Sequence, residues 1–132
     1  MTEEEASFQP GGFNNTIRWL TGHVYSVAEK FFLFQSPEHP KVIPDYYPEL
    51  FGMGTRPSEW NREAPTLSEL KQQLTFQKER IEALPAALWA EQAPFHFAQR
   101  ELYTYGDMFG MALYHEANHL GHMQSIKRLA NK

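Results

Sequence analysis

Apolar residues recur at helical spacing in three long stretches of the chain, at about residues 15–34, 66–84 and 104–129. Residues three and four apart share one face of a helix, so this spacing is typical of amphipathic helices that bury one side. The alternation that marks a half-buried strand is weak throughout. The pattern therefore predicts an all-α fold, an up-down helical bundle that contains three long helices.

Polar residues in front of each stretch can begin these helices. Either Asn14 or Asn15 could cap the first one. Thr66 and Glu69 form a capping box before the second, in which each side chain can bind the backbone amide of the other residue. Thr104 stands in a similar position before the third stretch. These residues predict where the three helices start.

The segments outside the helices differ in composition. Residues 36–65 hold six of the nine prolines together with several aromatic residues, which predicts a long crossover packed over the core. Residues 86–91 suit a short helical turn, and residues 92–103 suit an irregular or weakly extended segment. Residues 1–12, which end in Pro-Gly-Gly, are expected to form a loose leader before a single domain at residues 13–132.

Composition excludes several classes of function. The chain has 132 residues and a net charge of -4, so a basic surface for nucleic acid is not expected. Its N-terminus is acidic rather than a signal peptide, and no apolar run approaches the length of a membrane span. We therefore expect a cytoplasmic protein without nucleic-acid or membrane partners. Because cysteine is absent, any metal would be held by nitrogen and oxygen ligands.

Histidines occupy positions where a core helix would normally carry leucine. His115, His119 and His122 recur at helical spacing on the apolar face of the third stretch. Imidazole is costly in an apolar core unless its nitrogens are paired, and a cation is one way to pair them. His115 and His119 can chelate one metal from a single helix face. His23, on the apolar side of the first helix, is the best candidate for a third ligand from a facing helix.

The other histidines are weaker candidates. His122 could be a fourth ligand, a hydrogen-bonding group behind the ligands or a simple helix-face residue, and we favour the second of these. His39 lies beside Pro40, and His96 lies between two phenylalanines in the segment expected to be irregular. We assign no role to His39 or His96.

Four segments of the chain resemble the DinB/YfiT-like superfamily. They are Asn15–His23, Phe51–Gly54, Pro65–Leu70 and His115–Gly121, and the resemblance covers residues 13–131. Its most specific part is the combination of an upstream histidine with an H-x-x-x-H motif in the last helix. The resemblance implies a helical bundle of the four-helix type with a three-histidine site for a divalent metal, often nickel or zinc.

Carried over by position, the ligands implied by the resemblance are His23, His115 and His119, the same three that the spacing indicates. The superfamily includes thiol-dependent transferases and isomerases. The chain departs from the family pattern at His122, where glutamine often stands. It also departs before residue 13, where a dozen poorly helical residues take the place of the family's first helix.

Three functions compete. The first is a metal-dependent hydrolase or transferase that acts on a small molecule, with a low-molecular-weight thiol as a possible co-substrate. The second is a zincin protease, suggested by the H-E-x-x-H spacing at residues 115–119, but the 13 residues after His119 hold no acidic ligand and only the nearby His122. The third is a non-catalytic structural or interaction module stabilised by a metal with four protein ligands. We rank the metal-dependent enzyme first and the module second, and the sequence identifies no catalytic residue.

The absence of the family's first helix from this chain also leads to a prediction about its assembly. Three long helices would leave apolar side chains of the first one uncovered, among them Ile17, Leu20 and Val24. A homodimer whose interface uses the first helix would cover this patch. The alternative is a monomer in which the leader and the proline-rich crossover fold over the groove.

Overall fold

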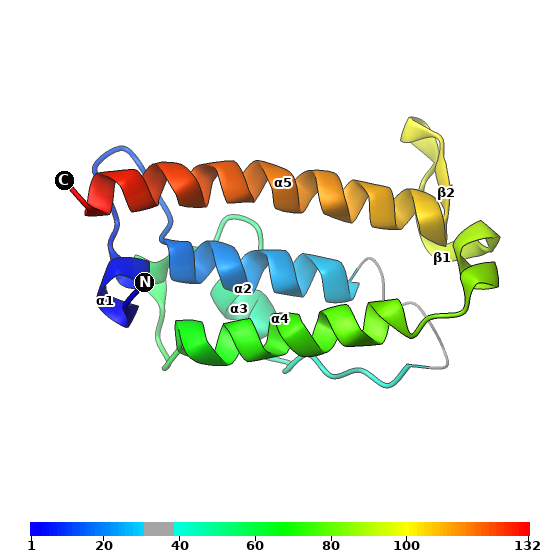
Figure 1. The fold of residues 1–132 in the computed structure, drawn as a ribbon, viewed down its shortest axis with the longest axis horizontal. Helices are drawn as coiled ribbons and strands as arrows, with labels where there is room; N and C mark the ends of the chain where they lie inside the picture. The colour runs from blue at the N-terminus through cyan, green and yellow to red at the C-terminus, as the bar shows by residue number, and fades with distance from the viewer. Residues whose placement is uncertain (31–38) are drawn as a thin grey trace.

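Three long helices form the body of the part of the chain that the structure describes, as the sequence predicted (Figure 1). The computed structural model describes residues 1–30 and 39–132. Helix α2 (Ile17–Ala28) lies between α4 (Leu67–Glu82) and α5 (Tyr105–Ala130) and contacts both of them. The expected end of the first helix near Phe34 lies outside the described residues. Within the described ranges, no helix combines the length and the apolar character that crossing a membrane would require.

Threonines cap all three long helices. The hydroxyl of Thr16 accepts a hydrogen bond from the amide of Trp19, so the N-cap predicted at Asn14 or Asn15 is wrong by one or two residues. Thr16 has the extended backbone that lets its hydroxyl reach the third amide of the helix. The capping box at Thr66 is confirmed, and Thr104 caps α5 in the same way.

The proline-rich crossover is packed on the core, as predicted, and it contains helical turns. Helix α3 (Tyr47–Phe51) begins with a proline near its first turn, where the missing amide proton costs nothing. A 3-10 turn, η2 (Pro57–Glu59), follows it. The side chains of Tyr47, Leu50 and Phe51 are almost completely buried. Aromatic residues from the crossover thus form one side of the core.

A small hairpin between α4 and α5 makes the fold mostly helical rather than all-α. After the turn η3 (Ala86–Ala90), strand β1 (Gln92–Phe97) pairs with strand β2 (Leu102–Thr104) in antiparallel fashion. The turn η4 (Ala98–Arg100) joins the strands, and the next residue, Glu101, has a positive φ of 55°. The pairing is irregular, which explains why its sequence pattern was weak.

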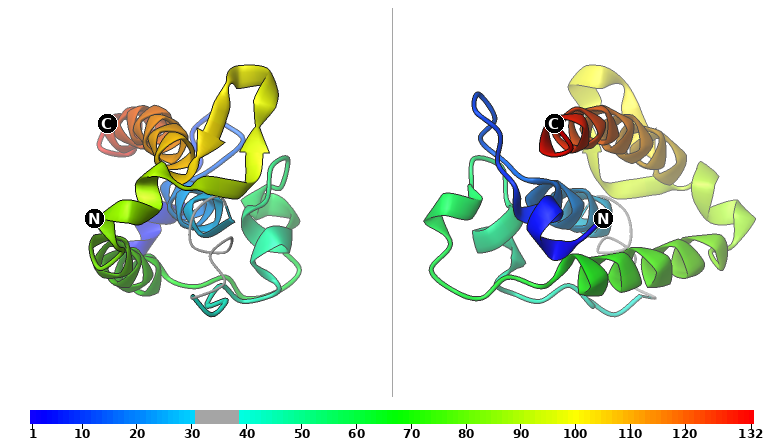
Figure 2. Two further views of the ribbon diagram at one scale, coloured as in Figure 1. Left: turned by 90° about the vertical axis from the view of Figure 1, so that its right-hand side faces the viewer. Right: turned by 60° about the vertical axis from the view of Figure 1, so that its left-hand side comes forward.

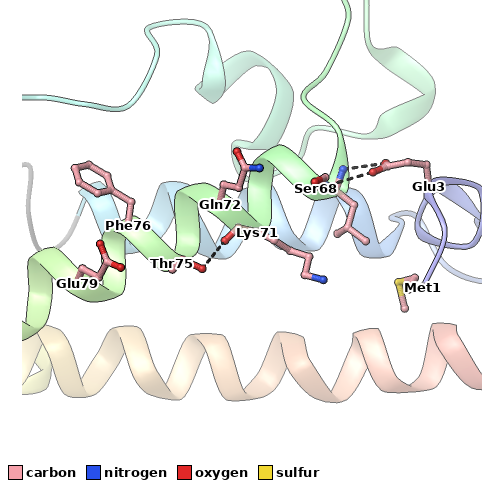
Figure 3. Close-up of a pocket in the computed structure, with 9 residues that line it drawn as sticks. Met1, Glu3, Ser68, Lys71, Gln72, Thr75, Phe76 and Glu79 are labelled. Atoms are coloured by element: carbon pink, nitrogen blue, oxygen red, sulfur yellow. Dashed lines mark hydrogen bonds between the residues drawn. The ribbon is translucent and has the colours of Figure 1, made fainter.

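The N-terminal segment is not a loose leader. Residues Glu3–Ser7 form helix α1, whose first turn is closed by a capping box and whose Ala6 is fully buried. The carboxylate of Glu3 accepts hydrogen bonds from the amides of Leu67 and Ser68 at the start of α4 (Figure 3). The segment is anchored because it satisfies amides of α4 that have no partner within that helix.

A hollow of about 550 Å³ lies beside this contact, on the side of α4 shown in Figure 3. Its lining comes from the N-terminus and α4, and consists of Met1, Glu3, Leu67, Ser68, Lys71, Gln72, Thr75, Phe76 and Glu79. None of these residues is a histidine, so the hollow is separate from the histidines discussed below.

Helix α2 is enclosed within the single chain, as the end-on view on the left of Figure 2 shows. Helices α1, α3, α4 and α5 all contact it, and Ile17, Leu20 and Val24 are each at most 6% exposed. These three side chains, which the predicted dimer interface on this helix was expected to cover, are therefore already covered within the chain. A homodimer as such stays a prediction.

Candidate metal centre

Helix α2 contributes His23 to the centre. This side chain is only 7% exposed. Its Nδ1 atom donates a hydrogen bond to the carbonyl oxygen of Phe51 in α3, at 2.6 Å. Its ring also stacks on Trp19, one helical turn earlier, with centroids 4.6 Å apart and planes inclined by 14°. These two contacts fix both the position and the plane of the imidazole.

A glycine makes the contact between α2 and α3 possible. A Cβ atom added to Gly22 would overlap the ring of Phe51. Phe51 itself is fully buried and packs edge-on against Tyr47 and Trp60, so it has little room to move. The glycine next to His23 therefore allows α3 to approach closely enough for the Phe51 carbonyl to hold the histidine.

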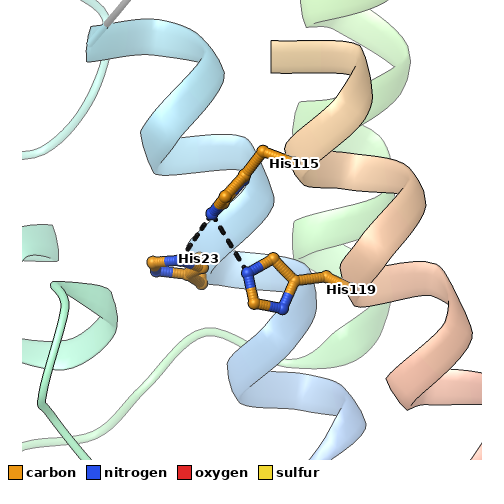
Figure 4. Close-up of side chains that lie close together, drawn as sticks. All are labelled: His23, His115 and His119. Carbon is orange, nitrogen blue, oxygen red and sulfur yellow. Dashed lines mark hydrogen bonds between the residues drawn. The ribbon is translucent and has the colours of Figure 1, made fainter. Parts of the chain in front are cut away.

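Helix α5 contributes two further histidines, whose rings lie next to that of His23. His115 and His119 lie one turn apart and project toward His23, as Figure 4 shows. The Nε2 atom of His115 is 3.1 Å from Nε2 of His23 and 3.0 Å from Nε2 of His119. Two nitrogens bound to one ion at about 2.0–2.1 Å would lie roughly 3–3.4 Å apart. The two measured spacings fit ligands of a single metal ion, and ligand atoms of all three histidines lie within 4.8 Å of one another.

Hydrogen bonds among the three neutral rings cannot pair all three Nε2 atoms. Because the Phe51 carbonyl can only accept, neutral His23 carries its proton on Nδ1 and presents a lone pair at Nε2. His115 carries at most one proton on Nε2, and this proton can point to His23 or to His119 but not to both. With neutral rings, at least one close contact therefore lacks a well-directed proton. A cation at the meeting point would accept all three lone pairs.

Burial keeps the rings neutral. It lowers the pKa of His23 below its usual value, although the hydrogen bond to Phe51 acts in the opposite direction. Burial and then the nearby His23 lower the pKa of His115. Burial, followed by the neighbours His115, His23 and His122, lowers the pKa of His119 to about 4. Neutral imidazole is the form that binds a metal, so few protons compete for this centre near pH 7.

This electrostatic arrangement predicts the pH dependence of stability in the metal-free protein. Unfolded histidines titrate near their ordinary pKa of 6.5, whereas the folded cluster stays neutral at lower pH. Below about pH 6.5 the unfolded state therefore binds more protons, and the free energy of unfolding should fall as the pH falls toward 4. Urea unfolding between pH 7 and 4.5 measures this slope. The slope should be shallower in a His119→Gln variant, and an equal slope in both proteins would contradict the explanation.

The remaining histidines lie outside the cluster of ligand atoms. His122 is exposed, and its ring centroid is 5.6 Å from that of His119. His96 lies in the hairpin against Tyr103, and His39 lies in the crossover. Among the described residues, the group whose ligand atoms lie within 4.8 Å of one another and could hold a metal consists of His23, His115 and His119. The structure thus brings together the three histidines that the spacing selected.

Sequence reasoning missed the groups that hold His23. Trp19 precedes the histidine by four residues, so its position on the same helix face was a readable signal. The Phe51 carbonyl carried no such signal, because a backbone oxygen from a distant turn cannot be identified from residue types. The buried Nδ1 atom of His119 has no hydrogen-bond partner among the described residues.

The fold is mostly helical, and a cluster of three histidines that could hold a metal ion lies between two facing helices. The chain belongs to the DinB superfamily, which it matches over residues 1–123. The resemblance seen in the sequence is therefore confirmed, and the match also includes residues 1–12, which were expected to depart from the family pattern. No curated protein matches the chain.

Proposed function

We propose that the protein binds one divalent metal ion, nickel or zinc, through His23, His115 and His119, and that it is a metal-dependent enzyme acting on a small molecule. The observation that carries this proposal is the cluster of three neutral imidazoles, in which Nε2 of His115 lies 3.1 Å from Nε2 of His23 and 3.0 Å from Nε2 of His119. Nitrogen ligands suit both metals, and the cluster contains neither a carboxylate nor a thiolate.

The side chains around the centre would prepare it before the ion arrives. The Phe51 carbonyl and the Trp19 ring hold His23 in the tautomer and plane that present Nε2. The rigid helix α5 sets the spacing of the other two nitrogens. Because the ligands are positioned in advance, little conformational entropy would be lost on binding.

The number of ligands supports a catalytic role. A divalent ion held by three neutral imidazoles keeps its full charge and an open coordination position, where it can polarise a substrate as a Lewis acid. The two half-buried ligands, His115 and His119, place the centre at the edge of the core rather than deep inside it. We infer hydrolysis or thiol-dependent group transfer, the reactions that the superfamily resemblance suggests.

The alternative is a non-catalytic module in which the metal joins α2 to α5. Structural sites of this kind usually have four protein ligands. His122 is the nearest further histidine, and its exposed ring lies beside His119 rather than within the cluster. The three-ligand set therefore favours the enzyme.

A reaction screen distinguishes these two functions. Protein loaded with nickel or zinc is mixed with a low-molecular-weight thiol and a panel of electrophiles, and separately with ester and amide substrates. We expect turnover with at least one class and none with a His115→Ala variant treated in the same way. Loss of folding stability on metal removal, without turnover on any panel, would instead support the structural module.

A further inference from the structure

The outer face of α5 is apolar and exposed, although the inner face of the same helix carries two of the histidines. Leu113, Tyr114 and Leu120 are 50%, 72% and 52% exposed. Ala117 and Gly121, on the same side, are exposed as well. At about 100° per residue these five positions lie within roughly 60° of Ala117, so they form one continuous stripe along the helix. We call these five residues, with Gly110 and Gln124, the outer stripe.

The glycines of the outer stripe have no explanation within the chain. A Cβ atom built on Gly110 or on Gly121 would meet no other atom within 4 Å among the described residues, and neither glycine has a positive φ. Glycine destabilises a helix interior relative to alanine. Two glycines at exposed positions, without steric need, fit a surface against which a partner packs closely.

The charges of α5 lie outside the outer stripe. Asp107 occupies the first turn, and Lys127 and Arg128 occupy the last. Between them the helix carries one charged side chain, Glu116, about a quarter turn away from Ala117. The stripe is therefore uncharged over almost four turns, with opposite charges at its two ends.

The side chains of the outer stripe and the charges at its two ends match those of a second copy of the helix that runs in the opposite direction. In an antiparallel pair related by a twofold axis at Ala117, Leu113 of one copy lies beside Leu120 of the other. Tyr114 then lies over Gly121, so a large side chain meets a residue without one. Asp107 approaches the basic last turn of the second copy. A twofold interface requires such a match of one surface with itself.

From these observations we infer that the protein forms a homodimer in which the outer stripes of two α5 helices pack antiparallel around Ala117. The occupant of this face is thus a second copy of the chain. Because His115 and His119 are on the opposite side of α5, the second copy would contact the face of α5 that points away from the proposed metal centre. The centre would still face α2.

Charge substitution at the twofold axis tests this inference. Ala117 is exposed, so Ala117→Glu and Ala117→Lys should leave the single chain folded. In the dimer each would place two like charges together. By light scattering at micromolar concentration, we expect the natural protein at twice 15.4 kDa and each variant at 15.4 kDa. An equimolar mixture of the two variants should return to the double mass, because glutamate then faces lysine.

Asn118→Glu is the matched control, since it adds the same charge to the next residue, at the margin of the stripe, and should keep the dimer. Circular dichroism verifies that all variants are folded. A natural protein at 15.4 kDa would overturn the inference, as would an Ala117→Glu variant that stays dimeric. A mixture that stays monomeric, or an Asn118→Glu variant that dissociates as readily, would also overturn it.

Discussion

Replacing any one of His23, His115 and His119 by alanine is expected to abolish the binding of one equivalent of divalent metal. Each substitution removes one of three nitrogens whose atoms lie within 4.8 Å of one another, and two nitrogens rarely hold an ion against dialysis. Metal content per chain, measured on dialysed protein without an affinity tag, shows the loss. A full equivalent retained by the His23→Ala variant would contradict ligation between α2 and α5.

Three other histidines provide controls for this result. His39→Ala and His96→Ala should leave the metal content unchanged, because neither side chain belongs to the cluster. If His122, whose ring centroid is 5.6 Å from that of His119, hydrogen-bonds a ligand in the loaded protein, His122→Ala should keep the ion but bind it about 10 to 100-fold more weakly. Complete loss of metal from the His122→Ala variant would make this residue a ligand and favour the structural module.

Gly22→Ala is expected to lower the free energy of unfolding by about 2–3 kcal/mol, which is typical of forcing an extra group into a packed core. The new methyl group would lie 2.6 Å from Cζ of Phe51, whose ring is enclosed by Tyr47 and Trp60. Any shift of α3 also moves the carbonyl that holds His23, so metal affinity should fall as well. Urea unfolding and metal titration measure the two effects.

Gly11→Ala is the matched control for this substitution, because a Cβ atom at Gly11 meets nothing within 4 Å among the described residues. It should change stability by less than about 0.5 kcal/mol. If the Gly22→Ala protein were as stable as the control protein, the close approach of α2 and α3 would not be a requirement of this fold.

The long helices and the three-histidine cluster were predictable because each leaves a periodic mark in the sequence. His115 and His119 repeat at one helical turn, and His23 shares the apolar side of its own helix. Thr66 and Glu69 likewise show a local pattern that needs no information about the rest of the chain.

Features that depend on distant contacts were not predictable in the same way. Helix α1 is five residues long, and much of its support comes from Glu3 binding amides more than sixty positions away. The hairpin is short and irregular, so its strands show little alternation. The exposure of α2 was misjudged because the crossover that covers it has no periodicity from which its path could be derived. For this reason we place the proposed homodimer interface on α5, whereas the sequence led us to expect it on α2.

The metal content of the purified natural protein tests the central proposal most directly. Protein produced without an affinity tag is loaded with nickel or zinc, dialysed and analysed for metal per 15.4 kDa chain. We expect one equivalent, with all three histidine rings perturbed together in the NMR spectrum relative to metal-free protein. A chain that retains no metal, or that retains it without a change at His23, His115 and His119, would contradict the account.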